Sequence, residues 1–204
     1  MRFPAIFAIA LVASFLATSG FGESPLVQEF ASGKKTRFTT KGHSKSMGLT
    51  ITLDYPASWQ EKDGDRPHIV KKFVPKAGGE SETALLAITE IGEKVSDQDI
   101  REIATAEGAK GILPEGVKLH KASLTAIDGT PAAMLEYSKR SERAGVTVEL
   151  YYLAYYFSFG TKLIQFQGSV GMAPTTAEAL EARMREFKPL YQQMAASIVI
   201  MEKW

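Results

Sequence analysis

Residues 146–159 read VTVELYYLAYYFSF and constrain the architecture more than any other segment of the chain. Successive residues of a strand point to opposite faces, which places Tyr152 and Tyr156 on one face and Tyr151 and Tyr155 on the other. Because the second half of the segment is apolar on both faces, we expect this strand in the middle of a sheet, with another layer covering each side.

Turn signals on both sides of this strand predict antiparallel neighbours. Gly160 leads into a strand over 161–170, and Asp128-Gly129 upstream is a strong hairpin signal. The charged segment 139–145 is expected to be a loop. The remaining predictions are strands at 117–127, 131–138, 48–55, 68–74, 83–91 and 197–201, and a polar turn at 60–67.

Two helical patterns lie among these strands. Ser96 and the acids that follow it open the first helix, which ends near Gly108. The second begins at about Pro174, and Pro189 inside it is expected to kink or split it. Its apolar stripe consists of Leu180, Met184, Phe187, Tyr191 and Met194. These elements predict an α+β fold, an antiparallel β-sheet flanked by helices.

Residues 1–22 have the pattern of a secretory signal peptide. Arg2 is the single leading charge, an apolar run follows, and small residues precede an expected cleavage after Gly22. The apolar run is shorter than the roughly 20 residues that span a bilayer. We therefore expect a periplasmic or secreted protein with no transmembrane segment after cleavage. An uncleaved anchor is the alternative.

Residues 23–46 form a basic leader without periodicity. The prediction is a flexible, solvated segment, and a basic arm for an anionic lipid or a partner is the alternative. The basic residues are Lys34, Lys35, Arg37, Lys41 and Lys45, and no acid lies between Glu29 and Asp54. The expected organisation is a signal peptide at 1–22, this leader at 23–46 and a single domain at 47–204.

Composition excludes several classes of protein. The chain has 204 residues, 24 Lys or Arg against 23 Asp or Glu, and no Cys. A net charge near zero gives no reason to expect nucleic acid or an anionic membrane as a partner. Without Cys the chain can form neither a disulfide framework nor a thiolate zinc site.

Several segments together carry a family resemblance. An alternating strand runs into Tyr55-Pro56-Ala57-Ser58-Trp59, and Ile127-Asp128-Gly129-Thr130-Pro131-Ala132 follows downstream. The long strands around Gly160 come next, and a last helix runs into Ser197-Ile198-Val199-Ile200. In this order, over about residues 47–202, the chain resembles the PsbP/DcrB-like superfamily. The resemblance implies an antiparallel sheet flanked by helices in an exported or lumenal protein that binds partners or assists assembly. It implies no catalytic set.

No motif indicates a catalytic, metal or nucleotide site. His43, His68 and His120 lack the spacing of a zinc site, and the last two are interpreted as ordinary strand histidines. Asp63-Gly64-Asp65 lacks the further ligands of a calcium loop. Ser32-Gly33-Lys34-Lys35 matches S-x-x-K without the other elements of that enzyme class. We expect no cofactor and no metal.

Aromatic residues are concentrated in the central strand. Packing beneath the two helices is the favoured interpretation, and a ligand pocket or partner surface lined by one pair of tyrosines is the alternative. The candidate ligand- or partner-binding residues are Tyr151, Tyr152, Tyr155 and Tyr156.

The sequence favours a non-catalytic, exported binding or assembly-accessory protein, whose partner is an envelope protein or a small ligand. An envelope hydrolase with an unrecognised carboxylate or metal site is the alternative, and a neutraliser of an envelope-targeted toxin would share the features of the first class. A deep pocket with converging titratable groups would favour the enzyme, and a broad apolar surface would favour the binding protein.

Overall fold

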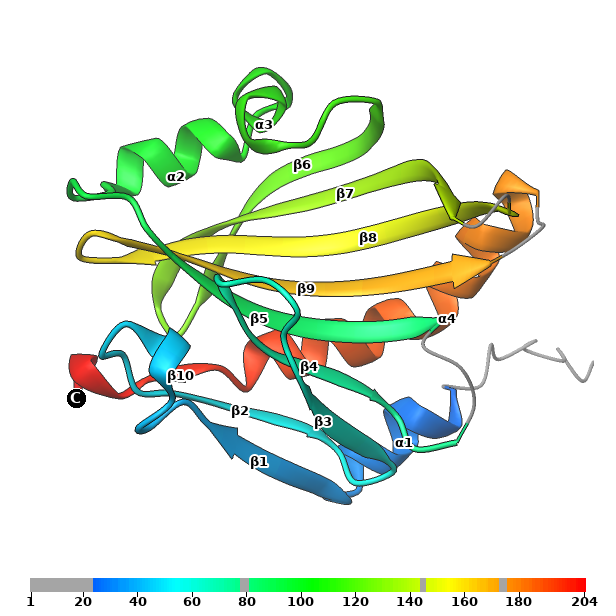
Figure 1. Cartoon of the computed structure of the whole chain (residues 1–204), viewed down its shortest axis with the longest axis horizontal. Coiled ribbons are helices and arrows are strands. Elements are labelled where there is room, and N and C mark those ends of the chain that lie inside the picture. Colours follow the sequence, from blue (N-terminus) through cyan, green and yellow to red (C-terminus); the bar gives the residue numbers. More distant parts are fainter. Residues whose placement is uncertain (1–23, 78–80, 144–145, 173–175) are drawn as a thin grey trace, which may run out of the picture.

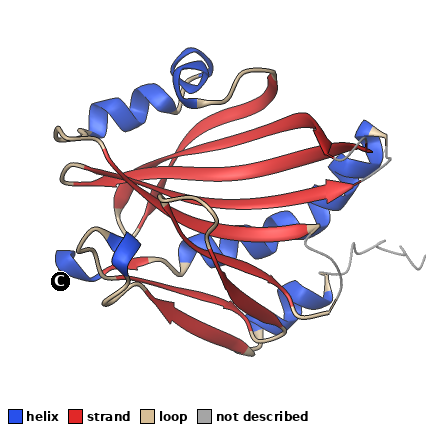
Figure 2. Cartoon of the chain, viewed as in Figure 1, coloured by secondary structure: helices blue, strands red, loops and turns tan. Residues whose placement is uncertain are grey.

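The computed structural model of the chain describes residues 24–77, 81–143, 146–172 and 176–204. Within them, two antiparallel sheets of order β3-β4-β5-β9-β8-β7-β6 and β1-β2-β10 pack against one long helix, α4 (Figures 1 and 2). The strands are β1 (Lys35–Thr39), β2 (Ile51–Pro56), β3 (Trp59–Asp63), β4 (Ile69–Pro75), β5 (Glu82–Glu90), β6 (Val117–Ile127), β7 (Thr130–Arg143), β8 (Val146–Phe159), β9 (Lys162–Met172) and β10 (Val199–Ile200). The helices are α1 (Pro25–Ala31), α2 (Asp97–Ile103), α3 (Ala106–Ile112) and α4 (Ala177–Ala196), with short 3-10 turns η1 (Ser44–Ser46) and η2 (Met201–Lys203). The predicted α+β class with antiparallel strands is confirmed.

The hairpins of the large sheet turn where the sequence predicted. Asp128 and Gly129 join β6 to β7 with φ of 48° and 69°, the positive values that a two-residue type I′ turn requires. Gly160, with φ 62°, turns β8 into β9. The strands predicted at 117–127 and 146–159 are confirmed at both ends.

β8 lies between β7 and β9, as its two-sided apolar pattern predicted. One of its faces carries Leu153 and Phe157 and packs in the same core cluster as α4. The other carries Ala154 and Tyr156 and packs with α2 and α3. We call these two sides of the large sheet the α4 face and the α2 face. Figure 1 shows α2 and α3 above the large sheet and α4 behind β5 and β9.

The expectation of a flexible leader is wrong for residues 24–46, because they belong to the core. Val27 and Phe30 of α1 are buried in the cluster that contains α4, and the ring of Phe38 on β1 meets Phe73 edge-on at 5.5 Å. β1 pairs along its whole length with β2. The folded unit therefore begins before the predicted boundary at residue 47. The predicted signal peptide, residues 1–22, lies outside the described residues.

Asp54 on β2 binds the basic residues of β1. Its carboxylate accepts a hydrogen bond from Arg37 Nε at 2.8 Å and lies 2.9 Å from Lys35 Nζ. The hydrogen bond from Arg37 is the largest influence on the carboxylate and holds the pKa of Asp54 below its ordinary value, although burial opposes it. A carboxylate with a lowered folded-state pKa stabilises the fold above its unfolded-state pKa of about 4, and that contribution is lost as the pH falls through the folded-state pKa.

An Asp54→Asn variant is therefore expected to be less stable than the parent at pH 7 and to lose less further stability below pH 4. Urea unfolding at pH 7 and pH 3 measures both effects. Asp65→Asn is the matched control, because the Asp65 side chain is 71% exposed and its carboxylate lies 3.8 Å from Lys72 Nζ, too far for a hydrogen bond. If Asp54→Asn and the parent lost equal stability on acidification, Asp54 would not be the group responsible.

Strand pairing continues into two segments that were expected to be a turn and a loop. Residues 60–67 were expected to be a turn, but β3 pairs with β4 from Trp59 to Asp63, and Trp59 is buried. The expected loop at 139–145 begins instead as a continuation of β7, which pairs with β8 as far as Arg143. At the other end of the chain, the strand predicted at 197–201 is shortened to β10, because η2 follows it.

The helical predictions also change in detail. The first predicted helix is in fact two helices, α2 and α3. Thr105 starts α3 as its N-cap, because its hydroxyl oxygen accepts a hydrogen bond from the backbone N–H of Gly108. Gly108 allows the chain to turn sharply between α2 and α3, since a Cβ on residue 108 would lie 2.2 Å from the carbonyl oxygen of Glu102. Pro189 does not split α4, where it is exposed beside the buried Leu190.

Candidate functional site

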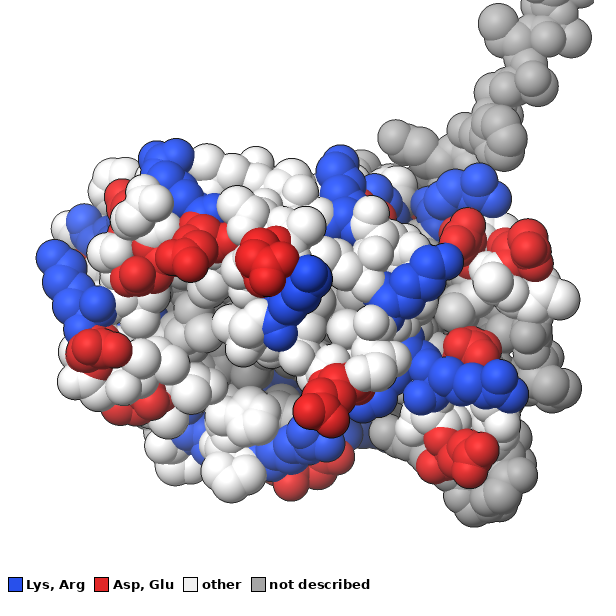
Figure 3. All heavy atoms as spheres, turned by 90° about the horizontal axis from the view of Figure 1, so that it is seen from above, with Lys and Arg blue, Asp and Glu red and all other residues white. Residues whose placement is uncertain are grey.

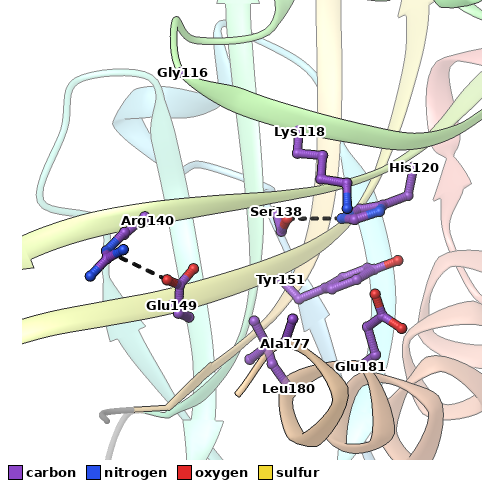
Figure 4. A pocket seen from close by; sticks show the side chains of 10 residues that line it. All are labelled: Gly116, Lys118, His120, Ser138, Arg140, Glu149, Tyr151, Ala177, Leu180 and Glu181. Carbon is purple, nitrogen blue, oxygen red and sulfur yellow. Dashed lines mark hydrogen bonds and ion pairs between the residues drawn. The ribbon is translucent and has the colours of Figure 1, made fainter. Parts of the chain in front are cut away.

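A cleft of about 270 Å³ opens on the α4 face, between the strands β6, β7 and β8 and the first turns of α4 (Figure 4). The strands supply its floor and one wall, and the helix supplies the other wall. Its lining residues are Gly116, Lys118, His120, Ser138, Arg140, Glu149, Tyr151, Ala177, Leu180 and Glu181.

Strand register places the polar residues of the cleft in rows. Ser138 on β7 faces Lys118 on β6 and Tyr151 on β8, and Arg140 faces Glu149 in the next row. The register of β6 shifts between Leu119 and Lys121, so His120 has no direct partner on β7. A bulge of this kind redirects a side chain. The imidazole Nε2 of His120 lies 2.8 Å from the hydroxyl oxygen of Ser138.

His120 and Tyr151 form a stacked pair on the floor of the cleft. Their ring centroids are 4.8 Å apart and the planes are inclined by 8°. Burial, and then the nearby Lys118, lower the pKa of His120 from its ordinary 6.5. Burial raises the pKa of Tyr151 to about 12, with smaller contributions from Glu136 and Glu181. Both rings are therefore uncharged at neutral pH, and the floor is an aromatic surface that retains polar atoms.

The walls carry charges of both signs. Arg140 Nε lies 3.7 Å from Glu149 Oε1, and the Arg140 side chain is 70% exposed. Lys118 and Glu181 are exposed and form no ion pair with any residue in the described ranges. Figure 4 shows Lys118 beside His120 and Glu181 beside Tyr151, on opposite walls. Besides the Arg140–Glu149 pair, the cleft thus offers one cation, Lys118, and one anion, Glu181, across an aromatic floor.

The four tyrosines predicted as candidate binding residues lie as two pairs on the two faces of the large sheet, Tyr151 and Tyr155 on the α4 face and Tyr152 and Tyr156 on the α2 face. Tyr151 lines the cleft and Tyr155 is buried under α4. Tyr156 is buried on the α2 face, where its hydroxyl accepts a hydrogen bond from Gln165 Nε2 at 3.1 Å. Tyr152, also on the α2 face, stacks on Tyr137 at 4.8 Å. Of the four, Tyr151 is the one that lines this cleft, together with the polar side chains of His120 and Ser138.

Sequence reasoning missed the neighbours of Tyr151. His120 was interpreted as an ordinary strand histidine, and Ser138, Arg140, Glu149 and Glu181 were not singled out. The Asp128-Gly129 turn was a usable signal. It pairs the strand before it with the strand after it, and counting equal numbers of residues away from the turn places the region of His120 opposite Ser138. The contribution of Glu181 from α4 had no such signal, since it depends on how the helix packs on the sheet.

The described residues contain no group of three or more His, Cys, Asp or Glu side chains placed to hold a metal ion. In the same part of the chain, none of the helices combines the length and the apolar character that crossing a membrane requires. Figure 3 shows Lys and Arg interspersed with Asp and Glu over the face seen from above, without a region of one sign.

Comparisons with known proteins identify a fold and no family. No protein-family profile matches the chain, and no curated protein matches it in sequence. LpqN of Mycobacterium tuberculosis, described as involved in cell envelope biogenesis, has a similar structure with a TM-score of 0.50 and 13% identity, over 88% of this chain and 98% of LpqN. This likeness shows a shared fold.

Two further structures are more distantly similar, each with a TM-score of 0.42 over 74% of this chain. One is a Bacteroides thetaiotaomicron protein with 12% identity, and this chain spans only 44% of its length. The other is the protein of unknown function PA94 of Pseudomonas aeruginosa, with 20% identity and 96% of its length covered.

Proposed function

We propose that this protein is an exported, non-catalytic binding or assembly-accessory protein of the cell envelope, and that its cleft binds an extended segment of a partner protein. The observation that carries the proposal is the His120–Tyr151 stack, an uncharged aromatic floor at the base of an open cleft with charges on both walls. Aromatic groups that combine apolar area with polar atoms are enriched at binding surfaces.

The size and charge of the cleft favour a peptide segment as its occupant. Pockets that enclose small molecules have volumes of roughly 300 to 1,000 Å³. This cleft is smaller, about 270 Å³, and its rim carries Lys118 on one wall and Glu181 on the other. A short extended segment can place one aromatic or aliphatic side chain on the floor while its polar groups meet the two charges.

Envelope localisation rests on the sequence and on one structural relative. Residues 1–22 have the signal-peptide pattern, and the proposed organisation keeps this segment separate from the folded domain. LpqN, which shares the fold, is described as involved in cell envelope biogenesis. The motif order from Tyr55 to Ile200 further supports assignment to the PsbP/DcrB-like superfamily, whose implied role is binding or assembly.

A His120→Leu variant is expected to reduce recovery of the envelope partner about tenfold or more, because truncating a central aromatic contact of an interface has effects of that size. The measurement is native mass spectrometry of the tagged protein purified gently from its own host's envelope fraction. His68→Leu is the matched control, since His68 is half-buried and lies outside the cleft. Equal recovery by both variants would contradict a binding role for the cleft.

One contact favours a second candidate function. His120 Nε2 lies within hydrogen-bond distance of the Ser138 hydroxyl, an arrangement that could serve a hydrolase with Ser138 as nucleophile and His120 as base. Against it, no carboxylate among the described residues hydrogen-bonds His120 to orient it. Labelling of the protein by a fluorophosphonate probe, abolished in Ser138→Ala, would favour the hydrolase over the binding protein.

A further inference from the structure

β6 is an edge strand of the large sheet, and its second half is exposed. The strand is last in the sheet order, so only one of its two sides is paired, with β7. From Lys121 to Ile127 each residue faces one residue of β7 without a register shift. Leu124 is 45% exposed, and Thr125 and Ala126 are also exposed. No described residue bonds to the outer backbone of this segment.

The edge strands β1, β3 and β10 have features that discourage pairing with another chain, and the second half of β6 lacks them. Edge strands in proteins are blocked by charges, by bulges or by being very short. β3 carries Glu61, Lys62 and Asp63, β1 carries Lys35 and Arg37, and β10 has only two residues. In β6 the bulge lies before Lys121, and residues 122–126 read ASLTA without a charge. An unprotected, regular edge of this kind is suited to accept another strand.

We propose that β6 pairs antiparallel with β6 of a second copy of this chain, about a two-fold axis that passes through Leu124. This register places Ala122 opposite Ala126 and Ser123 opposite Thr125. Leu124 then lies against its own symmetry mate, and Lys121 faces Ile127 at each end. No like charges oppose each other, and such self-complementary contacts are what a two-fold interface requires.

The two faces of the segment support this register. Leu124 faces Ala133 of β7, which belongs to the α2-face cluster, so the paired leucines lie on that side. Ser123 and Thr125 face Met134 and Ala132, which belong to the α4-face cluster. The hydroxyls of these two residues would therefore meet across the interface on the α4 face, where Ser–Thr pairs form favourable cross-strand contacts.

Pairing about this axis joins the two large sheets into one. A two-fold axis perpendicular to a sheet keeps equivalent faces on the same side, so the α4 faces of both copies point in one direction. The clefts that contain His120 would then lie on the same side of the continuous sheet, one on each side of the axis. The dimer does not depend on what the clefts bind.

The oligomeric state of the full protein tests the proposal. We expect light scattering coupled to size exclusion to show a concentration-dependent dimer. The double variant Ser123→Lys/Thr125→Lys opposes like charges in both symmetry-related pairs and should raise the dimer dissociation constant about tenfold or more. Ser123→Lys/Thr125→Glu opposes unlike charges in the same register and should restore dimerisation.

Two controls keep the result interpretable. Ile91→Lys adds a charge at a residue of similar exposure, 43%, at the end of β5, and should leave the dimer intact. The Lys/Glu variant also shows whether lysine at 123 is compatible with folding, which circular dichroism checks in each protein. A parent protein that is monomeric at every concentration would overturn the proposal. Equal dissociation of the Lys/Lys and Lys/Glu variants would overturn the register.

Discussion

A Tyr191→Ala variant is expected to have a free energy of unfolding about 4 kcal/mol lower than the parent protein, within the range for removing a fully buried aromatic side chain. Tyr191 on α4 is completely buried between the sheets. Its ring meets Trp59 edge-on at 6.4 Å and packs against Phe187 at 6.0 Å, and its hydroxyl donates to the Ser169 carbonyl at 2.7 Å. Removing the ring leaves a cavity at the centre of the core.

Equilibrium unfolding in urea, followed by circular dichroism, measures the loss. Tyr191→Phe is the control, because it keeps the ring and removes only the hydroxyl. It is expected to lower the free energy of unfolding by about 1 kcal/mol, the net contribution of one hydrogen bond. If Tyr191→Ala and Tyr191→Phe proved equally stable, ring packing at this position would not matter and the arrangement of α4 between the sheets would be wrong.

A Gly168→Ala variant is expected to lower the free energy of unfolding by about 2 to 3 kcal/mol through overpacking. A Cβ at this position of β9 would lie 2.2 Å from Cγ of Tyr191, closer than real atoms approach. The absent side chain of Gly168 is therefore what allows the tyrosine ring to lie directly on the sheet. Urea unfolding again gives the measurement.

Two comparisons identify the steric cause. Gly111→Ala in α3, where a Cβ would meet nothing within 4 Å, is expected to stabilise the protein by about 0.5 to 1 kcal/mol. In the double variant Gly168→Ala/Tyr191→Ala the added methyl group no longer meets a ring, so the two effects should not add. Additive losses would show that Gly168 is required for a reason other than contact with Tyr191.

The large sheet could be predicted because its information is local. The alternating pattern of 146–159 and the Asp128-Gly129 turn fix strand position and hairpin register within short segments of chain. The stripe that includes Tyr191 likewise predicted the buried side of α4. The small sheet could not be predicted in this way. Phe38 is the only buried residue of β1, and one apolar side chain in a basic segment gives no periodic signal.

The candidate site was less predictable than the fold. Strand alternation separated Tyr151 and Tyr155 from Tyr152 and Tyr156, but it could not tell which pair faces a cleft, nor that Tyr151 lines it while Tyr155 is buried under α4. The bulge at His120 and the approach of Glu181 from α4 result from packing between distant elements. A single sequence contains no pattern that encodes either one.

The position of β2 in the small sheet has a consequence for when the protein can fold. β2 is paired on one side with β1 and on the other with β10, whose register joins Thr52 to Val199. Contacts between residues so far apart in sequence form late and slow the overall folding rate. A chain emerging from the ribosome cannot close this sheet until its last described strand has been synthesised. One side of β2 therefore stays unpaired during synthesis, even after all seven strands of the large sheet, which end at Met172, have been made.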